Sequence, residues 1–250
     1  MSSHARPLRL ALALALAVAL ASPLAAADDA RVSSVSASLG TDTIELPVLD
    51  DFTYPGEVPP VIRDITARAT PASNRFIAVM MPRPYLQELM TGKRSYLTRY
   101  LVVQTIRAGE QMVMPDNAFE QVRRTFRSDA QALLKRSQDA TRARSAQAVH
   151  DTGTTLGDPA MTVETGPMKS LGVFDDEPDA IALASVQPIT SSSSGGGIRK
   201  FNQVSAMAIV AVHRKPLLVT LNAEYESQED IDWAEQQARE WIRRVRELNR

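Results

Sequence analysis

Apolar residues recur at intervals of three and four positions along the last part of the chain. This spacing predicts an amphipathic C-terminal helix that packs its apolar stripe against a sheet. Ser227 precedes the repeat and Asp230 follows it by three positions, a pattern related to the capping box. We expect Trp241 in the core and Trp233 at the edge of the buried stripe. The repeating positions are Ile231, Ala234, Ala238, Trp241, Ile242, Val245 and Leu248.

Seven stretches have the apolar content or the alternation that is typical of strands. The clearest is 76–81, six consecutive apolar residues that predict a central strand buried on both faces. A hairpin turn is expected at 213–216, between two strongly apolar strands. The predicted strands cover 43–48, 76–81, 96–106, 161–173 (interrupted at Gly166-Pro167), 181–189, 201–212 and 217–225.

Helices are predicted between the early strands, at 59–69, 85–90 and 117–149. The long third helix has an apolar stripe as far as Leu134 and becomes polar on all sides from there. The segment 135–160 is therefore either a solvated helix extension leading into a linker, or a frayed linker. The Ser- and Gly-rich segment 190–197 is expected to be a flexible loop.

The order of these elements indicates the fold class. Helices separate the early strands, whereas the later strands follow one another directly. This order favours an α+β fold with a mostly antiparallel sheet covered by helices, similar to an α/β/α sandwich. It would contain a long central helix and the C-terminal amphipathic helix. We expect a single domain over 43–250, preceded by a flexible leader at 28–42.

The first 27 residues predict export. Arg6 and Arg9 form a basic start, an apolar Leu/Ala/Val run follows, and the segment ends in small residues before Asp28. This is the pattern of a cleaved signal peptide, with cleavage after Ala27 or Ala26. The apolar run is shorter than the roughly 20 residues that span a membrane. We expect a Gram-negative periplasmic protein, with full secretion as the alternative.

Composition excludes several kinds of chemistry. The chain has no cysteine, so it has no disulfide, thiol nucleophile, Cys-ligated zinc or lipid anchor on a Cys. Without residues 1–27 the net charge is about -3, because Arg6 and Arg9 are lost from 28 basic residues while all 29 acidic residues remain. Such a balance gives no reason to expect a nucleic-acid partner. The mature chain is expected to be soluble, with no further membrane span.

The two histidines of the mature chain are the first candidates for catalysis. A catalytic histidine needs a nucleophile and an orienting acid. Ser145 and Asp151 are near His150 in sequence, but the pattern of a nucleophile elbow is missing. His213 lies in the predicted hairpin turn. We interpret both as surface histidines and assign no catalytic residue.

Two other motifs suggest ligands only weakly. The acidic run at 175–179 could hold Ca²⁺, but it lacks the spacing and the glycine of a calcium loop. The segment 195–200 is Gly-rich and basic, but it lacks phosphate-loop spacing and leads into a strand, without a helix N-terminus. We interpret them as a solvated acidic turn and a mobile loop, and assign no metal or cofactor.

Basic residues follow the long helix over 123–144, interspersed with Glu120, Asp129 and Asp139. Alternating charges of this kind are typical of a solvated face with ion pairs. The alternative is a docking face for an envelope complex.

The C-terminal third resembles exported proteobacterial proteins with a PsbP/Mog1-like α/β/α layout. The resemblance covers about 50 residues, in which a hydrophobic hairpin ends in a Trp-containing amphipathic helix. It implies a binding or assembly module, and it supplies no site residue. The residues that carry it are 204–212, Arg214-Lys215-Pro216-Leu217-Leu218-Val219, Tyr225-Glu226-Ser227, Asp230-Ile231-Asp232-Trp233 and Trp241-Ile242.

These observations together favour an exported, non-enzymatic module that binds an envelope protein or a small ligand, or that supports envelope assembly. Two alternatives remain open. One is a periplasmic hydrolase whose site is built from scattered Asp, Glu, Ser and His residues. The other is an accessory subunit of a secretion or surface system.

Overall fold

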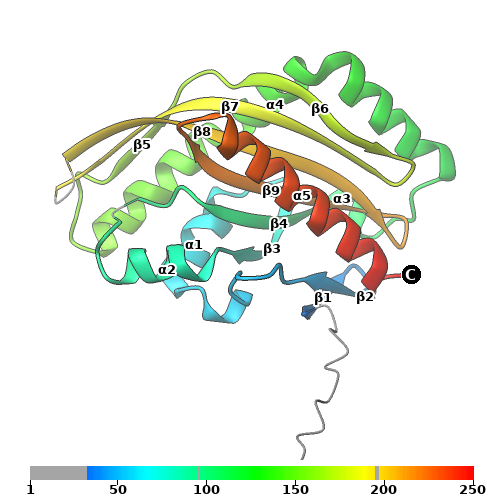
Figure 1. Ribbon diagram of the computed structural model, residues 1–250, viewed down its shortest axis with the longest axis horizontal. Coiled ribbons are helices and arrows are strands. Elements are labelled where there is room, and N and C mark those ends of the chain that lie inside the picture. The colour runs from blue at the N-terminus through cyan, green and yellow to red at the C-terminus, as the bar shows by residue number, and fades with distance from the viewer. Residues whose placement is uncertain (1–32, 95, 195–196) are drawn as a thin grey trace, which may run out of the picture. The chain divides into compact units, whose positions relative to one another are not determined.

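A computed structural model describes residues 33–94, 96–194 and 197–250. The predicted signal peptide at 1–27 lies outside these residues. A seven-stranded sheet dominates the described chain, and all its strand pairs are antiparallel. The strand order is β3-β4-β9-β8-β7-β5, and β6 also pairs with β7 (Figure 1). The strands are β3 (Asn74–Met80), β4 (Tyr100–Ile106), β5 (Thr162–Thr165), β6 (Lys169–Glu177), β7 (Ala180–Ser193), β8 (Gly197–Val212) and β9 (Lys215–Tyr225).

One face of the sheet is closed by α5 (Gln228–Leu248), which lies across β8 and β9 (Figure 1). Even-numbered residues of β8 and odd-numbered residues of β9 point to this face and form the main core with α5. Trp241 is fully buried there, and Trp233 packs at the margin, as predicted. Ser227 and Asp230 form the expected capping box. We call this side of the sheet the α5 face.

A small hairpin completes the same core. It consists of β1 (Ser34–Leu39) and β2 (Asp42–Pro47), which pair with each other. The expectation of a flexible leader at 28–42 was therefore wrong for residues 34–39, and its first residues lie outside those described. Small Ser and Ala residues gave no strand signal, but Leu39 is fully buried and β2 supplies a partner.

The tip of this hairpin is held by a buried ammonium group. Lys215 Nζ donates to Leu39 O at 3.0 Å and pairs with the Asp42 carboxylate at 3.1 Å. The backbone N–H of Gly40 donates to Glu110 Oε1 at 3.0 Å. Gly40 has a φ of 64°, and a Cβ there would lie 2.2 Å from Glu110 O. Only glycine meets both conditions without movement.

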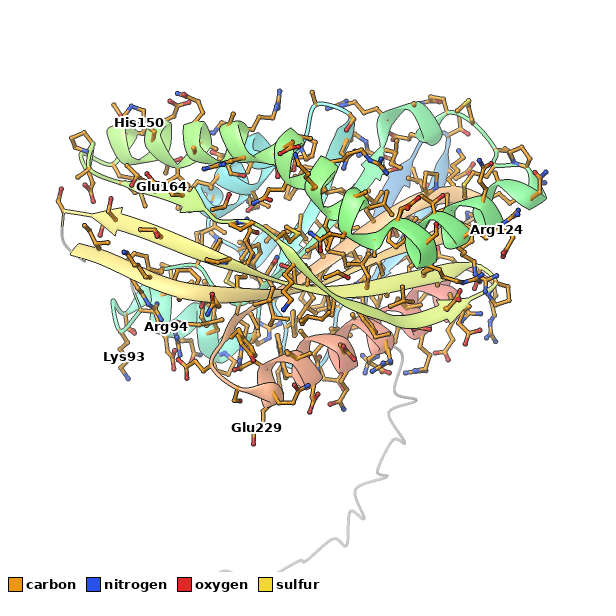
Figure 2. The ribbon with its side chains drawn as sticks, turned by 90° about the horizontal axis from the view of Figure 1, so that it is seen from above. Lys93, Arg94, Arg124, His150, Glu164 and Glu229 are labelled. Atoms are coloured by element: carbon orange, nitrogen blue, oxygen red, sulfur yellow. The ribbon has the colours of Figure 1, made fainter. Side chains whose placement is uncertain are left out.

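The opposite side of the sheet, which we call the α4 face, is covered in part by helices. Over β3 and β4 lies a second apolar cluster that includes Val58, Val79, Met81, Tyr85 and Val102. Figure 2 shows α4 and α5 on opposite sides of the strands. The remaining helices are η1 (Pro55–Glu57), α1 (Pro60–Ala69), α2 (Arg83–Met90), α3 (Arg107–Glu110) and α4 (Asp116–Thr155).

The long helix continues further than its apolar stripe. α4 has 40 residues and kinks at Asp129, whose φ of -129° and ψ of 30° are not helical. Of the two alternatives for 135–160, the helix extension describes the chain as far as Thr155. Packing on α1 supports it: Arg144 donates to Thr70 O and Arg68 donates to the hydroxyl of Thr152.

Two earlier strands also differ from the expected elements. The expectation of a central strand at 76–81 was wrong, because β3 lies at the edge of the sheet; helices and the β1–β2 hairpin bury both of its faces without a second neighbouring strand. The strand expected at 96–106 begins only at Tyr100.

The remaining differences concern the strands after α4. The expected strand 161–173 is two strands, β5 and β6, and β6 continues through Glu177. The predicted acidic turn at 175–179 is thus strand as far as Glu177. The flexible loop expected at 190–197 is also shorter, because residues 190–193 extend β7 and pair with 197–200 of β8. Cross-strand pairing overrides the low strand propensity of serine here.

The structure confirms the expected α+β class, with a mostly antiparallel sheet, a long helix and a C-terminal amphipathic helix. Among the described residues, no helix combines the length and the apolar content needed to cross a membrane.

Replacing Gly40 tests the close approach at the hairpin tip. Gly92→Ala is the matched control, because Gly92 has a φ of 71° and open space around its missing Cβ. We expect Gly40→Ala to lower the free energy of unfolding by at least about 1 kcal/mol more than Gly92→Ala, since only Gly40 adds a clash to the φ penalty. Urea unfolding measures the stability of both variants. Equal losses of stability would contradict the close approach of Gly40 to Glu110.

An ion-pair cluster on α5 predicts a pH dependence of stability. Hydrogen bonds from Arg243, and then from Arg244, lower the pKa of Glu240 from 4.5 to about 2. A lowered pKa contributes stability above pH 4.5, and this contribution is lost as the pH falls through about 2. We expect Glu240→Gln to cost up to about 1 kcal/mol at pH 7, with the difference from wild type vanishing near pH 2. A difference that persists at pH 2 in urea unfolding would show a packing effect instead.

Candidate functional site

Polar side chains cross the α4 face of the sheet in one row. Tyr100 on β4 is opposite Asn222 on β9, Asn222 is opposite Ser205 on β8, and Ser205 is opposite Ser185 on β7. We call these four residues the polar row. Adjacent strands are about 4.8 Å apart, so the row spans roughly 14 Å. Gln187, Gln203 and Glu224 form a neighbouring polar set on the same face, two positions along β7, β8 and β9.

Hydrogen bonds connect the middle of the row but leave one end without a partner. Ser205 donates to Asn222 Oδ1 at 2.7 Å, and Gln203 Nε2 donates to the same oxygen at 2.9 Å. Ser185 is 1% exposed, and its hydroxyl has no hydrogen-bond partner among the described residues. A buried hydroxyl without a partner costs roughly 1–3 kcal/mol. Such a group is able to bond to a ligand or a water molecule.

The other end of the row is a buried phenol. Burial raises the pKa of Tyr100 to about 12, so its hydroxyl remains protonated at neutral pH. The neighbouring Tyr85 donates to Tyr96 O at 2.7 Å and accepts from the backbone N–H of Thr98. These bonds fix the chain that leads from α2 into β4. Because Tyr100 remains protonated and the chain before it is fixed, its hydroxyl is a neutral hydrogen-bond donor in a fixed position on β4.

A hollow of about 470 Å³ lies where the α2–β4 connection meets the start of β8. On the α2 side, Arg94 pairs with Glu88 and lies over the ring of Tyr85, 5.2 Å from its centroid. Figure 2 shows Lys93 and Arg94 together at this connection, and Lys93 extends outward. The lining residues are Glu88, Lys93, Arg94, Tyr96 and Arg199.

Arg199 connects the hollow to β9. Its guanidinium lies 5.4 Å from the ring centroid of Tyr96 and 5.2 Å from that of Phe201. It also pairs with Glu224, which is opposite Gln203 on the neighbouring strand. Three cations face two carboxylates at this hollow, an excess of one positive charge. The arrangement suits a negatively charged group, because guanidinium and ammonium groups bind carboxylate and phosphate oxygens.

A second hollow, of about 550 Å³, lies at the kink of α4. Two glutamines on α4 line it and bond to the β5–β6 connection. Gln131 donates to Met168 O at 2.8 Å and accepts from Ser170 N at 3.0 Å, and Gln138 donates to Gly166 O. These amides already bind backbone groups, so we assign this hollow to the attachment of α4.

The histidines and the acidic run remain separate from both hollows. His150 lies toward the end of α4 (Figure 2), where the nearby Asp151 accepts a hydrogen bond from Gln147 instead. His213 lies in the β8–β9 turn with a φ of 48°. Neither histidine lines either of these two hollows.

The acidic run forms contacts within the protein. Asp176 binds Arg123 and Arg127, and hydrogen bonds, first from Arg127, lower the pKa of Asp176. Asp179 pairs with Arg246. The first part of the basic stretch 123–144 is thus a face with ion pairs. Among the described residues, no group of three or more potential metal ligands is found.

Sequence reasoning singled out the segment 195–200, which contains Arg199, but interpreted it as a mobile loop, whereas residues 197–200 belong to β8. It missed the other residues of the hollow and those of the polar row. Two signals were present. Basic pairs follow glycines at Lys93-Arg94 and Arg199-Lys200, and polar residues alternate with apolar ones inside the strands that carry Ser205 and Asn222. Neither signal shows that these segments meet, because their contact depends on the strand order.

No protein-family model matches the chain, and comparisons with curated proteins and with solved structures find no similar protein. The functional argument therefore depends on the geometry of the described residues.

Replacing each of two serines in the polar row by alanine is expected to change the free energy of unfolding in different ways. Ser185→Ala removes a hydroxyl without a partner, so we expect the free energy of unfolding to stay equal or rise by up to about 1 kcal/mol. Ser205→Ala removes a donor to Asn222 and is expected to cost about 1 kcal/mol. Thermal or urea unfolding compares them. A loss for Ser185→Ala as large as that for Ser205→Ala would show that Ser185 has a partner in solution.

Proposed function

We propose that this protein is an exported, non-enzymatic binding module that holds a negatively charged group in the hollow between the α2–β4 connection and the start of β8. The observation that carries the proposal is the excess of positive charge at the hollow, where Lys93, Arg94 and Arg199 meet two carboxylates. An anionic ligand or an acidic segment of an envelope protein would neutralise this excess of positive charge.

The geometry favours binding because the cationic groups are already ordered. Arg199 is held by two rings and by Glu224, so little side-chain entropy is lost when it binds an anion. Lys93 is exposed and has no ion-pair partner among the described residues, which leaves its ammonium group available.

Export is part of the proposal and rests on the signal pattern at 1–27. A periplasmic location is proposed first and full secretion second. The layout of helices on both sides of an antiparallel sheet is compatible with the PsbP/Mog1-like resemblance, which implies the same class of binding and assembly modules. A hydrolase remains the competing class, and no observed geometry favours it.

Charge reversal at Lys93 tests the proposal. Citrate serves as the anionic probe, and amide chemical shifts report where it binds. We expect shifts at Lys93, Arg94 and Arg199, and an affinity about fivefold lower in Lys93→Glu, because one cation near the anion becomes repulsive. Rising salt should weaken binding in the same way.

The matched control is Lys169→Glu, which reverses another exposed lysine, on β6. It changes the net charge by the same amount and leaves the hollow intact. An equal loss in both variants, or the absence of shifts at the hollow with millimolar citrate, would overturn the proposal.

A further inference from the structure

Strand β8 extends beyond its neighbour β9. β8 has 16 residues and β9 has 11, and their pairing stops at Asn202, which is opposite Tyr225. On its other side β8 stays paired with β7 as far as Gly197. Figure 1 shows the β7–β8 hairpin continuing past the point where β9 leads into α5. We call residues 197–201 the β8 overhang.

The open side of the overhang presents unpaired backbone groups. Ala211 N–H donates to Asp179 O at 2.8 Å, so odd-numbered residues of β8 direct their backbone groups to β7. In an antiparallel ladder the direction alternates, and even-numbered residues bond to the other side. The N–H and C=O groups of Ile198 and Lys200 therefore face the side on which no described strand lies. They could pair with an added strand.

Side chains cover parts of two other edges of the described sheets, those of β6 and β2. Along β6, Gln131 bonds to Met168 O and Ser170 N, and Arg239 donates to Phe174 O. These contacts are the usual protection of strand edges against unwanted pairing.

On β2, the Asn249 amide accepts from the N–H of Glu45 and donates to its C=O, both at 2.8 Å. At the overhang the Tyr96 hydroxyl bonds to Gly197 O, and among residues 33–94, 96–194 and 197–250 no such bond is found to the backbone of Ile198 or Lys200. This free edge is consistent with use by a partner.

The hollow lies at the same end of β8. Arg199 belongs both to the overhang and to the hollow lining, and the Tyr96 hydroxyl donates to Gly197 O at 3.3 Å. β9 cannot continue alongside, because the chain turns at Ser227 to begin α5. A strand added in line with β9 would have basic residues of the hollow on one side.

We propose that the β8 overhang and the hollow together bind an extended acidic segment of a partner protein, which adds as a strand antiparallel to β8. This inference rests on the proposed function and names the partner's chemistry. Main-chain bonds to Ile198 and Lys200 would supply affinity, and the side-chain pockets would supply specificity.

The two sides of the overhang determine the pattern of the partner segment. Arg199 points to the α4 face, where Lys93 and Arg94 also line the hollow, so this face would meet carboxylates. Lys200 points to the α5 face together with Ile198. Ile198 points to the α5 face and is 75% exposed, so it would meet an apolar side chain. Because strand side chains alternate, the segment should alternate acidic and apolar residues. A second copy of the overhang would bring basic residues against basic residues, which disfavours self-pairing.

The test uses the protein purified after expression of the full chain, and a blocked peptide of sequence Glu-Val-Glu-Val-Glu-Val. We expect hydrogen exchange at the amides of Ile198 and Lys200 to slow by about tenfold or more when the peptide is saturating, because both groups become hydrogen-bonded. A Gln-Val-Gln-Val-Gln-Val peptide should bind about tenfold more weakly, since it lacks the charges.

Two substitutions at one position separate backbone pairing from charge. Lys200→Pro removes the outward N–H, and Lys200→Thr removes the same charge while keeping the N–H. Proline is tolerated at strand edges, and urea unfolding checks that both variants keep the fold. We expect Lys200→Pro to weaken peptide binding about fivefold relative to Lys200→Thr.

Each failure has a different meaning. Strand addition is overturned if the peptide binds without slowing exchange at Ile198 and Lys200, and if Lys200→Pro and Lys200→Thr bind it equally well. If Lys93→Glu still weakens this binding, the anion site is supported even though strand addition is not. Equal binding of the Gln peptide overturns the acidic partner. Failure of both citrate and the peptide to bind overturns the proposed function together with this inference.

Discussion

The apolar contact between α5 and the sheet is the constraint on which the remaining structure depends. Trp241 is fully buried in it, and truncating such a side chain typically costs about 3–5 kcal/mol. Because strand side chains alternate, burying even-numbered residues of β8 under α5 directs Arg199, Gln203 and Ser205 to the opposite face. A shift of one residue would exchange the two sets. The register that forms the core therefore also forms the polar row and the hollow.

Side-chain amides and guanidinium groups control the edges of the sheets. Gln131 bonds to the β6 backbone as a neighbouring strand would, and Asn249 does the same for β2. These contacts also attach α4 and the end of α5 to the strands beside them. The β8 overhang stays open at the position where Arg199 and Lys93 concentrate positive charge. An exposed backbone edge and a positively charged hollow thus lie together at one end of β8, whereas side chains cover parts of the β6 and β2 edges. This combination is the reason for proposing that a partner strand binds there.

Local pattern predicted the elements whose burial is visible in sequence. The C-terminal helix and the hairpin turn at 213–216 have clear periodicity or turn residues, and the structure contains both. The apolar run at 76–81 also forms a strand, but β3 lies at the edge of the sheet and not at its centre. The pattern failed at 34–39 and 190–193, where serine and alanine have little strand preference and only pairing with a neighbour makes the strand. It left the chain after Lys135 undecided, because a helix without an apolar stripe is ordered there by its contacts with α1.

The sequence by itself determined the α+β class, the core stripe of the last helix and the absence of thiol chemistry, since these follow from composition and from periodicity within single elements. It did not identify a site. The hollow combines the α2–β4 connection with the start of β8, about 100 residues later, and the polar row takes one residue from each of four strands. Strand order and register bring these residues together, and both arise from long-range pairing, which no local pattern contains. Only the tertiary structure could decide that Arg199, Tyr96 and Glu224 are neighbours.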